Sequence, residues 1–202
     1  MEKFKEFSKT DKALAQIGVP GRFLKAHVDD FKPDRIEKLP DKIEPPGMFI
    51  FGSPSVGKTH LAAALVRREL QHHVLQGTDH KNQVLISGWW SNAHNILAEI
   101  RNTFGNKEGH SELELVKRYV TYDFLVIDDL GTEKQSEWAL AIICNIIDNR
   151  MNMDRTTLIT SNLSVKSWGE IDTRIVARLS AYTVVKFAGE DKRKEKGRMV
   201  EF

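Results

Sequence analysis

One octapeptide constrains the fold of this chain more than any other stretch: Gly52-Ser53-Pro54-Ser55-Val56-Gly57-Lys58-Thr59. It fits the pattern Gly-x-x-x-x-Gly-Lys-Thr in full. The apolar run 48–51 precedes it, and a helical pattern follows over 60–71. A strand that turns through glycines into a helix directs successive backbone N–H groups into one concavity at the positive end of the helix dipole. The stretch therefore predicts a strand, a phosphate-binding loop and a helix, in that order.

The residue types of this loop, which is a Walker A motif, indicate a nucleoside triphosphate as the ligand. Lys58 is expected to reach the β- and γ-phosphates, and the Thr59 hydroxyl to ligate magnesium. The other residues expected to surround the phosphates are Gly52, Ser53, Pro54, Ser55, Val56, Gly57 and His60. The alternative is a Gly-rich turn that binds nothing. Because every fixed position is filled and a strand and a helix flank the loop, ATP and Mg²⁺ are the predicted cofactors.

Composition places the chain among ordinary globular proteins. Its 202 residues are 29% charged and 41% hydrophobic, which suits one domain with a sizeable core. The net charge of +2 neither supports nor excludes contact with nucleic acid. The single cysteine, Cys144, rules out an internal disulfide. No apolar run reaches the ~18–20 residues of a membrane span, and the N-terminus is too charged for a signal peptide, so we expect a cytoplasmic protein.

Short apolar runs alternate with longer amphipathic ones beyond residue 47. The expected strands are 48–52, 83–87, 123–128, 156–160 and 183–187, and the expected helices are 58–74, 91–104, 111–121, 135–151 and 172–180. Such alternation predicts an α/β fold with a five-stranded parallel sheet covered by helices on both faces. Residues 1–20 are expected to form a short N-terminal helical segment, and residues 21–202 the nucleotide-binding domain.

A second motif, Phe124-Leu-Val-Ile-Asp-Asp129, is an apolar strand that ends in two acids. Asp128 fits the aspartate of a Walker B motif, which holds magnesium through its water shell. Asp129 is then the predicted base for the attacking water, with Glu133 as a less favoured substitute. The alternative is that the two acids only open a turn before Gly131. The Walker A motif upstream favours the catalytic interpretation.

Three further polar features follow the later strands. Asn162, in Thr160-Ser161-Asn162, is placed to hold the lytic water or to sense the γ-phosphate, although such a tripeptide also makes a good turn and helix cap. Arg174 and Arg178 share one helix face, from which an arginine could act on a neighbouring subunit's nucleotide; otherwise they are solvated helix residues. Arg193 could reach the phosphates of its own subunit, or belong to a solvated charged tail.

In this order and spacing, these elements resemble the AAA+ ATPases, in particular the branch of the bacterial helicase loaders DnaC and DnaI and the transposition helper IstB. The resemblance extends over about residues 15–195 and includes 17–24, Asp128-Asp-Leu-Gly131, the Thr-Ser-Asn tripeptide and the Arg-x-x-x-Arg helix. It implies a P-loop AAA+ domain with a reduced or absent helical lid. It also implies ATP hydrolysis, a replicative helicase as partner, single-stranded DNA, and a homo-oligomer in the ATP- and DNA-bound state.

Several functions remain open at this point. The leading one is an ATP-dependent loader of a replicative helicase that assembles on single-stranded DNA. The alternatives are a transposition helper, a small-metabolite kinase, and an ATP-binding module with negligible hydrolysis. For DNA contact, the candidates are Trp89 and Trp90, because two adjacent tryptophans cannot both point inward from a regular element. The slightly favoured alternative is that both pack against the segment 17–31.

Overall fold

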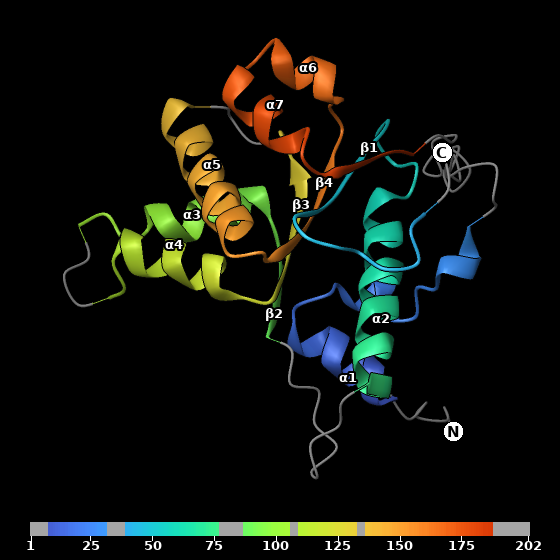
Figure 1. Cartoon of the computed structure of the whole chain (residues 1–202). Helices are drawn as coiled ribbons and strands as arrows, with labels where there is room; N and C mark the ends of the chain where they lie inside the picture. Colours follow the sequence, from blue (N-terminus) through green and yellow to red (C-terminus); the bar gives the residue numbers. More distant parts are fainter. Residues whose placement is uncertain (1–7, 32–38, 77–86, 106–108, 133–135, 188–202) are drawn as a thin grey trace, which may run out of the picture.

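The computed structural model describes residues 8–31, 39–76, 87–105, 109–132 and 136–187. Its centre is a parallel five-stranded sheet in the order β2-β3-β4-β1-β5 (Figure 1). The strands are β1 Gly47–Phe51, β2 Gly88–Asn92, β3 Phe124–Leu130, β4 Thr156–Ser161 and β5 Thr183–Lys186. The predicted α/β class and five-stranded parallel sheet are confirmed. The predicted reduction of the lid concerns residues after 187, which lie outside the described part.

Helices cover both faces of the sheet. They are α1 Lys9–Gln16, α2 Lys58–Gln76, α3 Ala93–Arg101, α4 Glu112–Thr121, α5 Glu137–Asn152, α6 Val165–Gly169 and α7 Thr173–Leu179. Successive strand residues point to opposite faces, so Met48 and Ile50 enter one core cluster with α1 and α2, while Phe49 enters another with α3, α4, α5 and α7. Because β1, β3 and β4 are buried along most of their length, the centre of the sheet lies between the two layers.

The helices begin where the sequence supplies a side-chain acceptor. Ser111 caps α4 and accepts from the backbone N–H of Glu114, whose carboxylate in turn accepts from the N–H of Ser111. The side chains of Ser136 and Asn92 cap α5 and α3 by accepting from the backbone N–H groups of Ala139 and Asn95. Each cap satisfies an N–H group that has no partner within the helix, which contributes about 1 kcal/mol. The Asn92 cap fixes where the chain leaves β2 and enters α3.

The second strand lies further along the chain than predicted. The sequence indicated 83–87, of which 83–86 lie outside the described residues, whereas the structure places the strand at Gly88–Asn92. Glycine at position 88 allows Ile17 to pack closely on this strand, because a Cβ there would lie only 3.1 Å from the Ile17 side chain. The backbone N–H of Trp90 donates to the Ile17 carbonyl at 2.7 Å, so the segment before η1 (Gly21–Phe23) covers this edge of the sheet.

The two tryptophans of β2 point to opposite faces of the sheet. Trp90 is 6% exposed and belongs to the core cluster that contains Ile17 and Val19. Trp89 is half-buried and stacks on Tyr122, with ring centroids 5.8 Å apart. The predicted packing against 17–31 is confirmed for Trp90. It is wrong for Trp89, because alternation along the strand sends that side chain to the other layer.

Helix α1 is attached to α2 by buried charges. Asp11 and Arg67 are 1% and 4% exposed and form an ion pair, and Lys25 also donates to Asp11. Burial by itself raises the pKa of Asp11, but the hydrogen bonds from Lys25 and Arg67 outweigh it and hold that pKa well below its ordinary value. The division of the chain at residue 20 stays a prediction.

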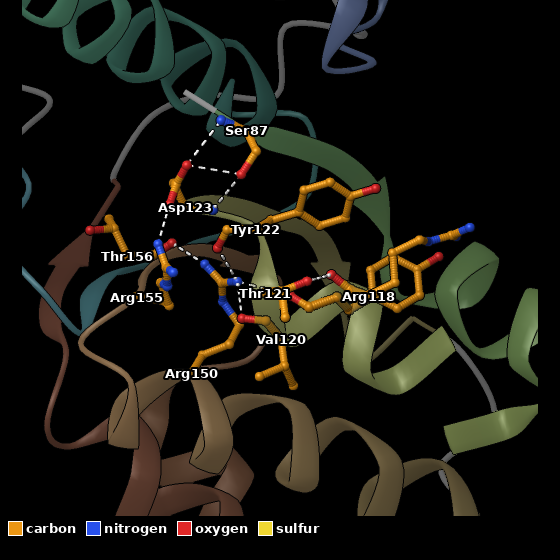
Figure 2. Close-up of polar contacts among 10 residues, drawn as sticks. Ser87, Arg118, Val120, Thr121, Tyr122, Asp123, Arg150, Arg155 and Thr156 are labelled. Carbon is orange, nitrogen blue, oxygen red and sulfur yellow. Dashed lines mark hydrogen bonds and ion pairs between the residues drawn. The ribbon is translucent and has the colours of Figure 1, made fainter. Parts of the chain in front are cut away.

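Arg150 of α5 is fully buried and joins α4 to β4 (Figure 2). Its guanidinium donates to the carbonyls of Tyr119 at 2.8 Å and Val120 at 3.1 Å, in the last turn of α4, and to that of Tyr122 at 2.7 Å. On the other side it donates to the Thr156 carbonyl at 2.6 Å and the Thr157 hydroxyl at 2.8 Å. Carbonyls at a helix C-terminus lack partners and carry partial negative charge, which the cation satisfies. Burial lowers the pKa of Arg150 to about 10, so the group remains charged at neutral pH.

Replacing Arg150 with Met is expected to lower the free energy of unfolding by about 3–5 kcal/mol, because several buried carbonyls lose their donor at once. Urea unfolding measures the loss. The matched control is Arg155→Met, which removes a 38% exposed ion-pair partner of Asp123 and is expected to change stability by less than about 1 kcal/mol. Equal losses in the two variants would contradict a special role for Arg150.

Candidate active site

The loop between β1 and α2 has the backbone of a phosphate cradle. Ser55 and Gly57 have positive φ angles of 64° and 112°, which turn their neighbours' N–H groups toward one side. Gly52 must lack a side chain, because a Cβ there would lie 2.2 Å from the Phe187 carbonyl oxygen. Val56 is 1% exposed and anchors the loop in the core. The loop opens at the N-terminus of α2, where the helix dipole favours an anion.

Lys58 is buried and crosses the loop. It is 5% exposed, and its Nζ donates to the carbonyls of Gly52 at 3.0 Å and Ser53 at 2.9 Å. It also donates to Oδ1 of Asn162 at 2.7 Å, just beyond β4. The structure thus brings together the Walker A lysine and the predicted sensor residue, which are 104 positions apart in sequence.

Asp128 lies next to Thr59, the last residue of the Walker A motif. The Thr59 hydroxyl donates to Asp128 Oδ1 at 3.1 Å, and the Thr160 hydroxyl donates to the same oxygen at 2.6 Å. Asp128 is 7% exposed. Burial raises its pKa, the Thr160 hydrogen bond opposes that rise, and the nearby charge of Asp129 adds to it. A buried carboxylate with a raised pKa favours a nearby cation, as expected of a magnesium-binding residue.

Asp129 occupies a strained position at the end of β3. It is half-buried, with a φ of 54°, in the left-handed region that few non-glycine residues adopt. Its backbone N–H donates to Thr160 Oγ1 at 2.9 Å. Glu133, the substitute predicted for Asp129, lies outside the described residues.

The turn after Asp129 is supported from behind by Ser161 and Trp168. The Ser161 hydroxyl donates to the Leu130 carbonyl at 2.7 Å and accepts from the indole N–H of Trp168 at 3.3 Å. Gly131 has a φ of 91°, and a Cβ at that position would lie 2.7 Å from the Trp168 ring. The ends of β3 and β4 are therefore fixed to each other, which holds Asp128, Asp129 and Asn162 near the loop.

His60, in the first turn of α2, contacts the segment that precedes β1. Its Nε2 lies 3.1 Å from Oδ2 of Asp30, which belongs to η2 (Val28–Asp30). Its ring stacks on Phe23 at 5.7 Å between centroids and is tilted against Phe31 at 4.9 Å. The sequence predicted His60 at the phosphates but gave no sign of this aromatic surrounding, because no regular pattern connects 22–31 to α2.

The structure does not bring Arg174 and Arg178 to the Walker A loop. Within the described residues, their polar partners are Asp172 for Arg174, at 2.6 Å, and Asp148 and the Arg174 carbonyl for Arg178. Both arginines lie on α7, whose side chains face α5 and solvent at these positions. Arg193 lies outside the described part of the chain.

The residues present fit ATP with magnesium. The loop N–H groups and the buried ammonium of Lys58 suit phosphates, while Thr59 and Asp128 supply the oxygen ligands that Mg²⁺ prefers. In the described part of the chain, no three His, Cys, Asp or Glu side chains are grouped to hold a metal by themselves. That agrees with an ion completed by substrate phosphates and water, since Mg²⁺ is usually held by one or two carboxylates together with phosphates.

Sequence reasoning missed the roles of Thr160, Ser161 and Trp168. The sequence predicted a chemical role for Asn162, whereas Thr160 and Ser161 were named only as members of the same tripeptide. The signal was available in principle: Thr160 follows the apolar residues Leu158 and Ile159 near the end of β4, and its fully buried hydroxyl requires a polar partner. Two adjacent acids at the end of the neighbouring strand were the candidates.

The chain is similar in sequence to known proteins. Residues 46–195 match the family described as IstB-like ATP binding protein. The replicative helicase loader DnaC of Escherichia coli K12 is 34% identical over 119 residues, which are 58% of this chain and 43% of that protein. The chain thus spans less than half the length of this curated relative.

Solved structures show the same fold. A crystal structure of DnaI superposes with a TM-score of 0.64 at 18% identity and covers 92% of this chain and 100% of that one. AMPPCP-bound DnaA from Aquifex aeolicus gives a TM-score of 0.58 at 18% identity, over 77% of this chain and 44% of that one. No helix in the described ranges is long and apolar enough to cross a membrane. The chain belongs to the family described as IstB-like ATP binding protein.

Proposed function

We propose that this protein is a magnesium-dependent ATPase of DNA replication that assembles on single-stranded DNA and loads a replicative helicase. The observation that carries the proposal is the similarity to the DnaC helicase loader, which reaches 34% identity over 119 residues. The chain retains what that activity requires on one subunit: a phosphate loop, a buried lysine and a carboxylate paired with a hydroxyl. ATP hydrolysis releases the assembled complex in this proposal; it does not drive processive movement.

Each residue of the site has a proposed part in hydrolysis. Lys58 binds the β- and γ-phosphates, and Thr59 with Asp128 holds Mg²⁺, which supplies charge neutralisation at the phosphates. Asp129 accepts the proton of the attacking water. Asn162 senses the γ-phosphate. Its Oδ1 accepts a hydrogen bond from the phosphate-binding Lys58 at 2.7 Å, so it lies beside the cation that would contact that phosphate.

A surface on α3 and α5 suits single-stranded DNA better than Trp89 and Trp90 do. Arg101 lies over the Trp138 ring at 4.8 Å, and Phe104 meets the same ring edge-on at 5.6 Å. Phe104 is 57% exposed, and the cluster borders a hollow of about 230 Å³ lined by His94, Leu97 and Arg101, among others. Aromatic rings beside a cation bind single strands of any sequence by stacking and charge.

The test is phosphate release in the presence of oligo-dT. DNA is expected to stimulate the parent protein, and Trp138→Ala to weaken the apparent DNA affinity by ~1–3 kcal/mol through lost stacking. Arg118→Ala is the matched control, because Arg118 also lies over an indole, that of Trp89 at 5.7 Å, but on α4. The control is expected to keep the parent's DNA affinity. Equal losses in both variants would place the DNA surface elsewhere.

A transposition helper is the second candidate, because the matching family is named after IstB. Binding of the purified protein, with ATP and single-stranded DNA, to a purified replicative helicase and to a purified IS21-type transposase separates the two. Retention of the helicase alone supports the loader. Retention of the transposase alone replaces the proposal with the helper function.

A further inference from the structure

We infer that Thr160 is a positioning residue of the ATPase site, whose buried hydroxyl holds both acidic residues at the end of β3. The inference rests on the proposed ATPase function and extends it to a residue that touches neither nucleotide nor metal. Thr160 lies in β4, 32 positions from Asp128 and 31 from Asp129.

The geometry gives this hydroxyl one possible orientation. Its oxygen accepts from the Asp129 backbone N–H at 2.9 Å, so its single proton is directed to Asp128 Oδ1 at 2.6 Å. Thr160 has no exposed surface, and water therefore cannot replace either contact. One side chain thus fixes the carboxylate of one acid and the backbone of the next.

A β-bulge explains why a side chain is needed at this point. Ile127 pairs with Ile159, and Leu130 pairs with Ser161, so Asp128 and Asp129 together stand opposite the single residue Thr160. A bulge leaves an N–H group outside the regular ladder and bends the strand. Here the Thr160 hydroxyl accepts a hydrogen bond from that N–H and thereby supports Asp129 at its unfavourable φ of 54°.

The hydroxyls of Thr59 and Thr160, which both donate to Asp128, have different roles. Thr59 also donates to Oδ1 of Asp128, at 3.1 Å, but its oxygen is itself a proposed ligand of magnesium. Thr160 makes the shorter contact, and both of its hydrogen bonds go to the bulge. It therefore sets the direction of the Asp128 carboxylate before any metal binds. Residues that orient metal-binding groups in this way typically contribute 10–100-fold to metal affinity or activity.

The experiment compares Thr160→Val, which keeps the shape and removes the hydroxyl, with Thr160→Ser, which keeps the hydroxyl. Three properties are measured: magnesium-dependent phosphate release, the Mg²⁺ concentration that half-saturates binding of a fluorescent ATP analogue, and hydrogen exchange of the Asp129 amide in nucleotide-free protein. Binding of ADP without Mg²⁺ is measured as a control. The valine variant is expected to lower kcat about 10–100-fold and to raise the Mg²⁺ requirement by a similar factor. Its binding of ADP without Mg²⁺ should match the parent, and its Asp129 amide should exchange faster.

Serine is expected to restore all three properties to within about threefold of the parent, since it keeps both hydrogen bonds. If valine prevents folding, Thr160→Cys takes its place, because a thiol is of similar size and donates only weakly. A valine or cysteine variant with the parent's kcat, Mg²⁺ requirement and amide exchange overturns the inference. If the parent itself releases no phosphate, the proposed function fails, while the Mg²⁺ titration and the amide exchange still decide the role of Thr160.

Discussion

Replacing Arg178 with Ala is expected to reduce ATP hydrolysis by the assembled protein by ~10³-fold or more, while each subunit still binds ATP. An arginine delivered to the transferring phosphoryl group from a neighbouring subunit contributes this much in related reactions. In a single chain the Arg178 guanidinium is 23% exposed and is held by Asp148 on α5 instead of reaching its own Walker A loop. It is therefore available to an adjacent subunit only after that ion pair opens. Phosphate release at protein concentrations that give assembly on oligo-dT measures the effect.

Mixing variants tests whether the site is shared between subunits. Lys58→Ala is expected to weaken ATP binding by ~2–4 kcal/mol, because it removes the buried cation proposed to pair with the phosphates. A mixture of Arg178→Ala and Lys58→Ala proteins pairs an intact loop with an intact arginine at some interfaces, so part of the activity should return. Arg155→Ala, which removes a distant surface arginine, serves as the control and should behave as the parent. No recovery at any ratio, with co-assembly shown by light scattering, would mean that the arginine does not act on a neighbour.

The phosphate loop could be predicted because its chemistry is carried by the backbone. Gly52 is required by a close backbone carbonyl and Gly57 by a positive φ, and only glycine meets either requirement readily. The motif can therefore be recognised from the sequence alone. Asp128 and Asn162 were predicted by a second rule, that polar residues at the carboxyl ends of parallel strands meet at one edge. Their indirect connection, through Thr59 to Asp128 and through Lys58 to Asn162, agrees with that rule.

The second strand and the bulge could not be predicted in the same way. The run Val84-Leu-Ile86 has a high strand propensity, whereas Gly88 and Asn92 lower the strand propensity of the observed strand. What decides the position is tertiary: Ile17 covers the edge of β2, and Trp89 and Trp90 fill opposite layers. The backbone N–H of Asp129 in the bulge likewise donates to the Thr160 hydroxyl on another strand, and no local sequence pattern in β3 predicts this contact.

Replacing Asp129 with Asn is expected to abolish most ATP hydrolysis, by about 10²–10⁴-fold, and to leave ATP binding unchanged. The amide has the shape of the carboxylate but cannot accept the proton of the attacking water. The carboxylate of an aspartate reaches one methylene less far than that of a glutamate. The bulge gives the half-buried Asp129 a φ of 54°, so its backbone departs from that of a regular strand. The measurement is phosphate release together with titration of a fluorescent ATP analogue.

Glu133→Gln is the matched control for Asp129→Asn, since it makes the same acid-to-amide change at the competing position. It is expected to retain nearly all of the parent's hydrolysis. An inactive Glu133→Gln beside an active Asp129→Asn would assign the base to Glu133. Thr160→Val separates geometry from chemistry in the same assay: it keeps the Asp129 carboxylate as a chemical group but removes the acceptor of the Asp129 N–H. If Asp129 is the base and its position depends on the bulge, Thr160→Val must lower kcat at saturating Mg²⁺ less than Asp129→Asn does. At the same Mg²⁺ concentration, adding Thr160→Val to Asp129→Asn must cost little more.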